Sequence, residues 1–337
     1  MTRTARTVVL AVVTSLLIGV AVAYTLHAAG RSESGPEQEL SEVTLDSPGR
    51  IVFRTTMAGT GRDHLAAVPL ADTGKDDGND NRRISPTACL VFHAAKGTGV
   101  CLKLANAALH TYNAVILDNR LLPVDSREMA GTPSRARVSP SGRLVAWTSF
   151  VGGESYAGLD FSTRTAILDR RTDTLHNNLE DFSIIRDGKP YTAADVNIWG
   201  VTFAADDNRF YATVATDGHR YLAEGDLAAR TLRTLRDNVE CPSLSPDGTK
   251  LAYKKRVDGT DPSRPWKLFT LDLATGRETP TTETRTLDDQ AEWLDNDAVL
   301  YNLPGDLRAD VWSVRADGTG TPVLVLRHAL TPAVLRP

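Results

Sequence analysis

The residues of this 337-residue chain that could carry chemistry are scattered acids and one group of polar and aromatic side chains. Asp160, Asp195 and Asp289 are candidate carboxylates for a lyase or glycosidase, because a glycosidase needs two carboxyls facing each other across a pocket. The seven histidines show no metal-ligand spacing, and the motifs Gly-x-Ser-x-Gly, His-Glu-x-x-His and Gly-x-x-x-x-Gly-Lys-Ser/Thr are absent. The sequence therefore predicts no catalytic residue, no metal and no cofactor, with an acid-based enzyme as the alternative.

A group of side chains between residues 155 and 199 is the strongest indication of a binding site. Polar and aromatic residues on loops over a rigid scaffold are typical of such sites. The candidate binding residues are Ser155, Tyr156, Asp187, Lys189, Tyr191, Asp195, Asn197 and Trp199. In the alternative interpretation Asp195 and Asn197 cap turns, and Trp199 packs between the blades of the fold predicted below. Two acidic stretches are predicted to be structural: residues 76–81, whose spacing does not fit a calcium loop, and Asp288-Asp289, a turn or a polar pair.

A short phrase that recurs with variations indicates the elements that position these residues. Its clearest copy covers residues 241–253, a second covers 137–147, and degenerate copies cover 201–213 and 291–301. Each copy predicts strand, turn, strand, because Pro-Asp-Gly or Asp-Asn-Asp favours a tight turn and the alternating apolar residues after it favour a strand. A second phrase, clearest at residues 267–277, predicts two more strands. Together the two phrases make a four-stranded antiparallel unit.

The spacing of this unit predicts an all-β, six-bladed β-propeller over residues 49–337. The last apolar positions of the second strands, or the residues in their place, are Phe53, Leu102, Trp147, Thr213, Tyr253 and Tyr301. The intervals between them are 49, 45, 66, 40 and 48 residues, and propeller blades span roughly 40–50. The long interval contains residues 152–158 and 181–197. In a propeller these two connections emerge on one face, so we expect the candidate binding residues near the mouth of the axial channel.

The two ends of the predicted propeller complement each other. The first unit lacks an apolar first strand, and residues 330–337 form a strand left over at the C-terminus. Pro332-Ala333-Val334 partly repeats the Pro242-Ser243-Leu244 that opens the clearest copy. We therefore expect the C-terminal segment to be the innermost strand of the first blade, which closes the ring and removes its open edges.

The repeated phrase resembles the WD-repeat-like propeller repeat of TolB-type proteins. Ser245-Pro246-Asp247-Gly248 followed by Leu251-Ala252-Tyr253 matches that repeat closely, and residues 139–142 differ from it at one position. Residues 89–101, 158–165 and 199–203 are also similar to N-terminally anchored TolB-like proteins of high-GC Gram-positive bacteria. The resemblance implies the propeller fold and says little about function, because this repeat serves many unrelated roles.

The N-terminus carries a targeting signal that has two interpretations. Arg3 and Arg6 precede an uncharged, mostly apolar stretch at residues 7–26. Ala21-Val22-Ala23 has the form of a signal-peptidase site, which would release the protein, whereas an apolar run of about 20 residues can also span the membrane uncleaved. The arginines place the propeller outside in both cases. We expect residues 1–29 to be a signal anchor or signal peptide and residues 30–48 a flexible polar linker.

The three cysteines predict one disulfide. Export favours disulfides, and Cys89 and Cys101, 12 residues apart on adjacent predicted strands, are expected to pair, with two buried free thiols as the alternative. A turn at Lys96-Gly97-Thr98-Gly99 would set a register that places the two sulfurs several residues apart, so the bridge requires the chain to reverse near Ala95. Cys241 is expected to be a small buried residue.

Charge and composition indicate the class of function. The net charge of −4 is spread along the chain without a basic stripe, which argues against a nucleic-acid partner. We therefore expect a non-enzymatic, membrane-tethered extracytoplasmic propeller that binds a protein, peptide or envelope ligand through its loop face.

Overall fold

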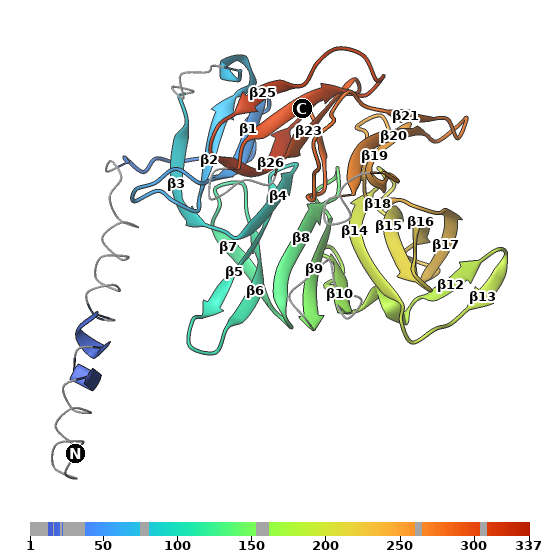
Figure 1. The fold of residues 1–337 in the computed structure, drawn as a ribbon, viewed down its shortest axis with the longest axis horizontal. Coiled ribbons are helices and arrows are strands. Elements are labelled where there is room, and N and C mark those ends of the chain that lie inside the picture. Colours follow the sequence, from blue (N-terminus) through green and yellow to red (C-terminus); the bar gives the residue numbers. More distant parts are fainter. Residues whose placement is uncertain are drawn as a thin grey trace, which may run out of the picture.

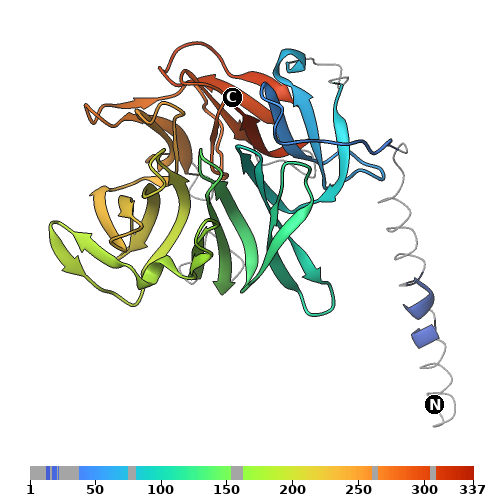
Figure 2. The same ribbon diagram turned by 180° about the vertical axis from the view of Figure 1, so that it is seen from behind.

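The computed structural model describes residues 13–15, 17–20, 22, 38–74, 81–152, 162–259, 265–303 and 309–337. From residue 50 onward the described chain folds into six sheets that follow one another around a ring, as Figures 1 and 2 show from opposite sides, and the four strands of each blade are antiparallel. The predicted all-β, six-bladed propeller is confirmed. Residues 75–80, which include most of the acidic stretch at 76–81, lie outside the described residues.

Blades 1 to 3 contain four strands each. Blade 1 consists of β26 (Ala329–Leu335), β1 (Arg50–Thr55), β2 (His64–Pro69) and β3 (Arg83–Ala88), with the 3-10 turn η1 (Leu70–Asp72) after β2. Blade 2 consists of β4 (Val91–Ala95), β5 (Thr98–Asn106), β6 (Thr111–Leu117) and β7 (Pro123–Met129). Blade 3 consists of β8 (Thr132–Val138), β9 (Leu144–Gly152), β10 (Ser162–Asp169) and β11 (Thr174–His176), and the 3-10 turn η2 (Leu179–Asp181) follows it.

Blade 4 is larger than its neighbours. It consists of β14 (Asn197–Phe203), β15 (Arg209–Thr216), β16 (His219–Asp226) and β17 (Thr231–Arg236), extended at its outer edge by β12 (Ser183–Arg186) and β13 (Lys189–Tyr191). Blade 5 consists of β18 (Glu240–Leu244), β19 (Lys250–Arg256), β20 (Trp266–Asp272) and β21 (Glu278–Pro280). Blade 6 consists of β22 (Glu292–Trp293), β23 (Ala298–Asn302), β24 (Val311–Arg315) and β25 (Val323–Leu326).

The C-terminal strand closes the ring as expected. β26 pairs antiparallel with β1, with Val52 opposite Ala333 and Ile51 opposite Val334, and the Gly49 N–H donates to the Leu335 carbonyl at 2.9 Å. In Figure 1 the red C-terminal strand accordingly lies beside the blue first strand. This pairing gives blade 1 an innermost strand and leaves β1 no open edge there.

The core of the described propeller is divided among the seams between neighbouring blades. The cluster between blades 5 and 6, for example, contains Trp293 and Tyr301, and the cluster between blades 3 and 4 contains Phe182 and Phe210. Alternation along each strand sends successive side chains into the two seams on either side of its blade. Each blade therefore contributes apolar residues to two clusters.

The segment before the first strand differs in part from the expected flexible linker. Val43 and Leu45 are 3% and 2% exposed and pack into the seam between blades 1 and 2. The ordered propeller thus includes residues from the second half of the segment 30–48. Of the predicted anchor at residues 1–29, the structure describes eight helical residues, and within the described residues no helix is long and apolar enough to span a bilayer.

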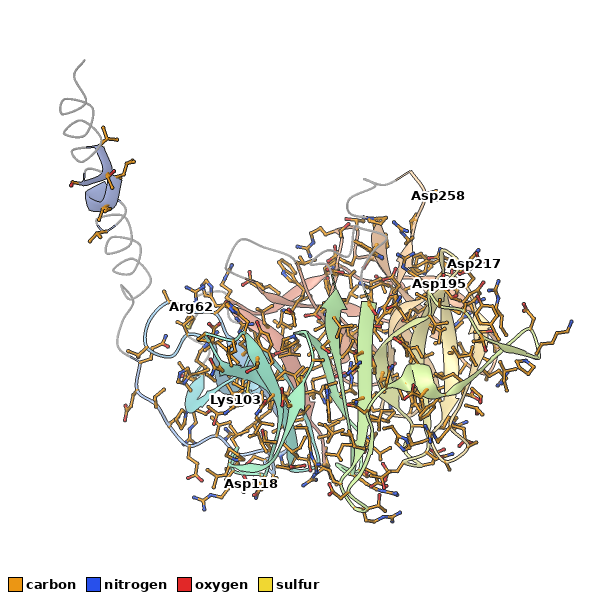
Figure 3. The ribbon with its side chains drawn as sticks, turned by 90° about the horizontal axis from the view of Figure 1, so that it is seen from below. Arg62, Lys103, Asp118, Asp195, Asp217 and Asp258 are labelled. Carbon is orange, nitrogen blue, oxygen red and sulfur yellow. A yellow bond between two sulfur atoms is a disulfide. The ribbon has the colours of Figure 1, made fainter. Side chains whose placement is uncertain are left out.

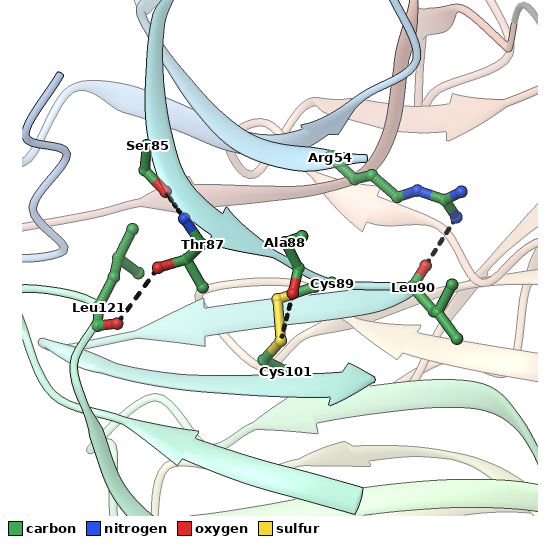
Figure 4. Close-up of a disulfide and its surroundings, with 8 residues drawn as sticks. All are labelled: Arg54, Ser85, Thr87, Ala88, Cys89, Leu90, Cys101 and Leu121. Atoms are coloured by element: carbon green, nitrogen blue, oxygen red, sulfur yellow. Dashed lines mark hydrogen bonds between the residues drawn. A yellow bond between two sulfur atoms is a disulfide. The ribbon is translucent and has the colours of Figure 1, made fainter. Parts of the chain in front are cut away.

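The predicted disulfide is present, and Figure 4 shows its surroundings. Cys89 and Cys101 are bonded with their Cα atoms 5.4 Å apart. The chain reverses at Lys96-Gly97, with Ala95 opposite Thr98, so the expected reversal near Ala95 is wrong. The bridge forms nevertheless because Cys89 lies before the first residue of β4. Its position is therefore not fixed by the pairing of β4 with β5. Cys241 is a free, buried cysteine.

Candidate functional site

The structure separates the eight candidate binding residues. Ser155 and Tyr156, like the candidate acid Asp160, lie outside the described residues. The remaining six fall at the outer edge of blade 4, at the corner between its strands, and in the seam with blade 3.

Asp187, Lys189 and Tyr191 lie on a hairpin at the outer edge of blade 4, where Figure 1 shows β12 and β13. β12 runs parallel to the outermost strand β17, and Asp187 stands in the turn with a φ of 52°. Burial of Phe182 and Ile184 in the seam between blades 3 and 4 holds this segment at the periphery. The expectation that these three residues stand near the mouth of the axial channel is therefore wrong.

Asp195 caps a turn, as the alternative interpretation proposed. Its Oδ1 accepts a hydrogen bond from Thr216 Oγ1 at 2.7 Å, and its Oδ2 accepts one from the Asp217 N–H at 2.6 Å. The bond from the Asp217 backbone, followed by that from Thr216, lowers the pKa of Asp195 below its usual value. Figure 3 shows Asp195 and Asp217 together on one face, with Asp118 on the other. Both carboxylate oxygens are thus used by the turn that joins β15 to β16.

Asn197 joins blade 4 to blade 3, and Trp199 is buried. Asn197 Oδ1 accepts a hydrogen bond from the Thr163 N–H in blade 3 at 2.7 Å. Trp199 is 2% exposed. Asn197 therefore has a structural role between the blades, and Trp199 has no exposed surface for a ligand.

A charged cluster at the axis was missed by the sequence analysis. Glu292 on β22 is buried and accepts a hydrogen bond from Arg137 at 2.5 Å and from both Nη atoms of Arg336 at 3.1 Å. His93 Nε2 lies 3.3 Å from the same carboxylate. The Val138 N–H donates to His93 Nδ1 at 3.0 Å, so the neutral imidazole carries its proton on Nε2 and donates to Glu292.

The environment of this cluster fixes its charges. Burial and then the positive Arg137 lower the pKa of His93 to about 4. Burial alone would raise the pKa of Glu292, but Arg336, His93 and Arg137 together hold it below its usual value. At neutral pH the cluster therefore contains a carboxylate, two guanidinium groups and a neutral imidazole. Such a carboxylate cannot serve as a general acid, which must hold a proton near the working pH.

A second polar layer fills the axis beside this cluster. Arg135 lies 3.3 Å from Asp289 and donates to the Asp288 carbonyl at 2.8 Å, and Lys254 pairs with Asp288 Oδ1 at 2.8 Å. Gln290 donates across the axis to the Val201 and Pro242 carbonyls at 3.1 and 2.6 Å. The expectation of a polar pair at Asp288-Asp289 is thus met at the axis. The layer separates a hollow of about 310 Å³ on one side from one of about 330 Å³ on the other.

The first hollow opens on the face that carries the turns between the first and second strands of blades 2 to 6, which we call the turn face. It shares Pro140, Phe203, Leu244, Ser245 and Pro246 with a groove of about 650 Å³ between blades 4 and 5. We call the axial hollow and this groove together the turn-face hollow. Its groove has an apolar floor and a rim that carries charges of both signs. The floor includes Tyr211, Leu235 and Leu273, and the rim includes Arg209, Glu224, Arg233 and Asp247.

The described residues do not form the acid pair that the enzyme alternative requires. Asp195 caps its turn, and Asp289 is paired with Arg135. Burial would raise the pKa of Asp288, but Lys254 and Arg135 lower it below its usual value. Within the described part of the chain no group of three His, Cys, Asp or Glu side chains could hold a metal ion. The sequence contained a signal for the axial cluster. Arg135 and Arg137 stand two residues apart on the first strand of blade 3, so both guanidinium groups point to the same side of that strand.

Comparisons with known proteins give the fold. No protein-family model and no curated protein matches the sequence. Among solved structures, TolB from Acinetobacter baumannii superposes with a TM-score of 0.57 and 18% identity over 86% of this chain and 67% of that chain. A putative TolB from Agrobacterium tumefaciens gives a TM-score of 0.49 and 11% identity over 85% and 92% of the two chains. A puromycin-hydrolyzing peptidase from Mycobacterium tuberculosis gives 0.47 and 15% over 89% and 48%.

The fold and the likeness to the first of these structures define a TolB-like β-propeller. At this level of identity the likeness extends to the fold alone. What the chain binds must therefore be argued from its own surface.

Proposed function

We propose that this protein is a non-enzymatic, extracytoplasmic scaffold that binds an extended segment of a protein partner in the turn-face hollow. The observation that carries the proposal is the continuity of the axial hollow with the groove between blades 4 and 5. A groove of about 650 Å³ is within the range of roughly 300–1,000 Å³ that ligand sites span. Because its lining continues from the axis to residues of both blades, it suits a peptide chain better than a compact small molecule.

The lining of the groove supports a peptide ligand. Leu235 is 39% exposed and Leu273 is partly buried, so the floor offers apolar surface that a partner's side chains could cover. Arg233 and Glu224 on the rim lie 3.1 Å apart and present both charges. A mixed rim around an apolar floor is the usual composition of a protein-binding surface.

The hairpin on blade 4 is a poorer site for a peptide. Arg186 and Lys189 flank the two-residue turn and form a hydrogen-bonded pair. The next pair along the hairpin is not hydrogen-bonded, so the backbone nitrogen of Pro190 faces outward, away from β12. Proline has no N–H to offer an added strand, and edge strands are protected in this way. The edge of β13 is therefore protected against the addition of a further strand, whereas the turn-face hollow is accessible to a peptide.

The scaffold role is supported by the state of the axial acids. Glu292 and Asp288 have lowered pKa values and are engaged by Arg137 and Lys254, so neither can supply the protonated general acid that a glycosidase pairs with its second carboxylate. The extracytoplasmic part of the proposal is supported by the N-terminal arginines and apolar stretch, and by the Cys89–Cys101 disulfide.

The test is a peptide selection against the purified protein, followed by affinity measurement on two matched variants. Leu235→Glu places an unpaired carboxylate on the groove floor, and Leu109→Glu makes the same change at a 72% exposed leucine in the turn between β5 and β6. We expect Leu235→Glu to weaken the selected peptides by about tenfold or more, which is about 1.4 kcal/mol, and Leu109→Glu to leave them unchanged. Equal affinities for both variants would contradict the proposal.

A further inference from the structure

The seam between blades 1 and 2 is built differently from the others. In five blades the second residue of the second strand is a large apolar side chain that is fully buried in the seam with the preceding blade. These residues are Ile51, Val145, Phe210, Leu251 and Val299. In blade 2 the equivalent residue is Gly99. This seam therefore lacks a side chain that each of the other five contains.

The next seam position of blade 2 is small as well. Two residues further along the second strand, blades 1, 3, 5 and 6 have Phe53, Trp147, Tyr253 and Tyr301. Blade 2 has Cys101 there, and its disulfide partner Cys89 lies in the same apolar cluster. The disulfide thus occupies part of the space that an aromatic ring takes in four other blades.

Residues 41–46, which we call the strap, fill the rest of that space. A Cβ atom on Gly99 would lie only 3.1 Å from Leu45 Cδ1, and 3.3 Å from both Phe92 and Leu117. The leucine of the strap therefore stands where the missing side chain of blade 2 would be. Val43 is buried in the same cluster two residues earlier, as the alternation of an extended segment requires.

The strap is held by few polar contacts. The Leu45 N–H donates to the Asn119 carbonyl and the Ser41 N–H to the Ile84 carbonyl, both at 2.7 Å. Asn119 Nδ2 donates to Asp46 Oδ2 at 2.9 Å at the surface. Arg120 also lies 3.4 Å from Glu42 of the strap in an exposed ion pair. Two buried apolar side chains, two backbone hydrogen bonds and two exposed polar contacts are the attachments expected of a bound peptide segment.

We propose that the seam between blades 1 and 2 is a binding site for an extended peptide of the pattern apolar–x–apolar–Asp, which the strap occupies in cis. Phe92, Gly99, Leu117 and Leu121 form the pocket for the second apolar side chain, and the Asn119 carbonyl and amide receive the backbone and the aspartate. The site is distinct from the turn-face hollow between blades 4 and 5. A segment of the same pattern binds it in trans when the strap is displaced.

The test uses the full chain and a synthetic peptide of residues 38–48. In the Leu45→Asp variant the strap is released, and we expect the peptide to bind the variant and raise its melting temperature, with no effect on the wild type. A peptide with aspartate in place of the leucine should have no effect on either protein. If Leu45→Asp does not fold, the milder Leu45→Ala variant serves for the same titration. The proposal would be overturned if the melting temperature of a folded variant did not change with the peptide, or if both peptides raised it equally.

A second variant tests the site from the propeller side. Gly99→Val supplies the side chain that blades 3 and 6 carry at this position, and we expect it to expel the strap. Limited proteolysis should then cut within residues 38–48 at least about tenfold faster than in the wild type. Unlike Leu45→Asp, this variant should not bind the peptide, because the valine fills the pocket. Unchanged protection of the strap in a folded Gly99→Val protein would also overturn the proposal.

Discussion

Removal of the C-terminal strand should open the ring and unfold the propeller. Deleting residues 330–337 takes away Val334 and Leu335, which are 4% and 3% exposed, and exposes the edge of β1. Burying such side chains contributes about 1.5–3 kcal/mol each, or about 3–6 kcal/mol together. The deletion also removes Arg336, one of the two guanidinium partners of the buried Glu292, which keeps its ion pair with Arg137.

The loss of about 3–6 kcal/mol from these two side chains alone approaches the entire stability of an ordinary domain, about 5–15 kcal/mol, and the backbone bonds of β26 to β1 are lost with them. We therefore expect the truncated protein to show no cooperative thermal transition by circular dichroism or calorimetry. The matched control removes only Pro337, which is exposed, and should melt like the full-length chain. A truncated protein that melts cooperatively within a few degrees of the full-length one would refute this account of ring closure.

The remaining predictions concern pH, the disulfide and the turn cap of blade 4. The unfolded state binds a proton at His93 below about pH 6.5, whereas burial keeps the folded imidazole neutral down to about pH 4, so stability falls as the pH falls between these values. From pH 6.5 to 4.5 we expect a loss of about 2 kcal/mol in urea unfolding that is absent in His93→Gln; equal slopes in both proteins would contradict the assignment. Replacing Cys89 and Cys101 by serine should lower the free energy of unfolding by about 3 kcal/mol, and an unchanged urea midpoint would show that the bridge does not form. Asp195→Ala should lower the free energy of unfolding by about 0.5–2 kcal/mol, as the loss of a side-chain cap does, without changing the affinity for selected peptides. A loss of peptide binding would instead place the site around Asp195, on the face opposite the turn face.

The repeat made the fold predictable, because turn residues and period-2 alternation recur at blade spacing. The closure by residues 330–337 followed from counting strands, and the Cys89–Cys101 pair from adjacent strands in an exported chain. The position of the β12–β13 hairpin could not be predicted in this way. β12 pairs in parallel with β17, whose residues come about 50 positions later in the chain, and nothing local distinguishes that pairing from a loop over the axis.

The axial cluster and the strap depend on contacts between distant parts of the sequence. Glu292, Arg137, His93 and Arg336 come from four blades, and only the closed ring brings them together. Val43 and Leu45 have the alternation of a strand, but two apolar residues in a polar segment are too few to indicate packing. The informative residue was Gly99, whose small size becomes meaningful only when it is compared with the equivalent position of the other five blades.

The measurement that tests the proposed function most directly is the location of a selected peptide on the propeller. Peptides obtained from the selection would carry a photo-crosslinker, and mass spectrometry would identify the attached residues. The account predicts cross-links on the floor of the turn-face hollow, at Tyr211, Leu235 or Leu273. Cross-links confined to the opposite face, around Asp195 and Asp217, would contradict it.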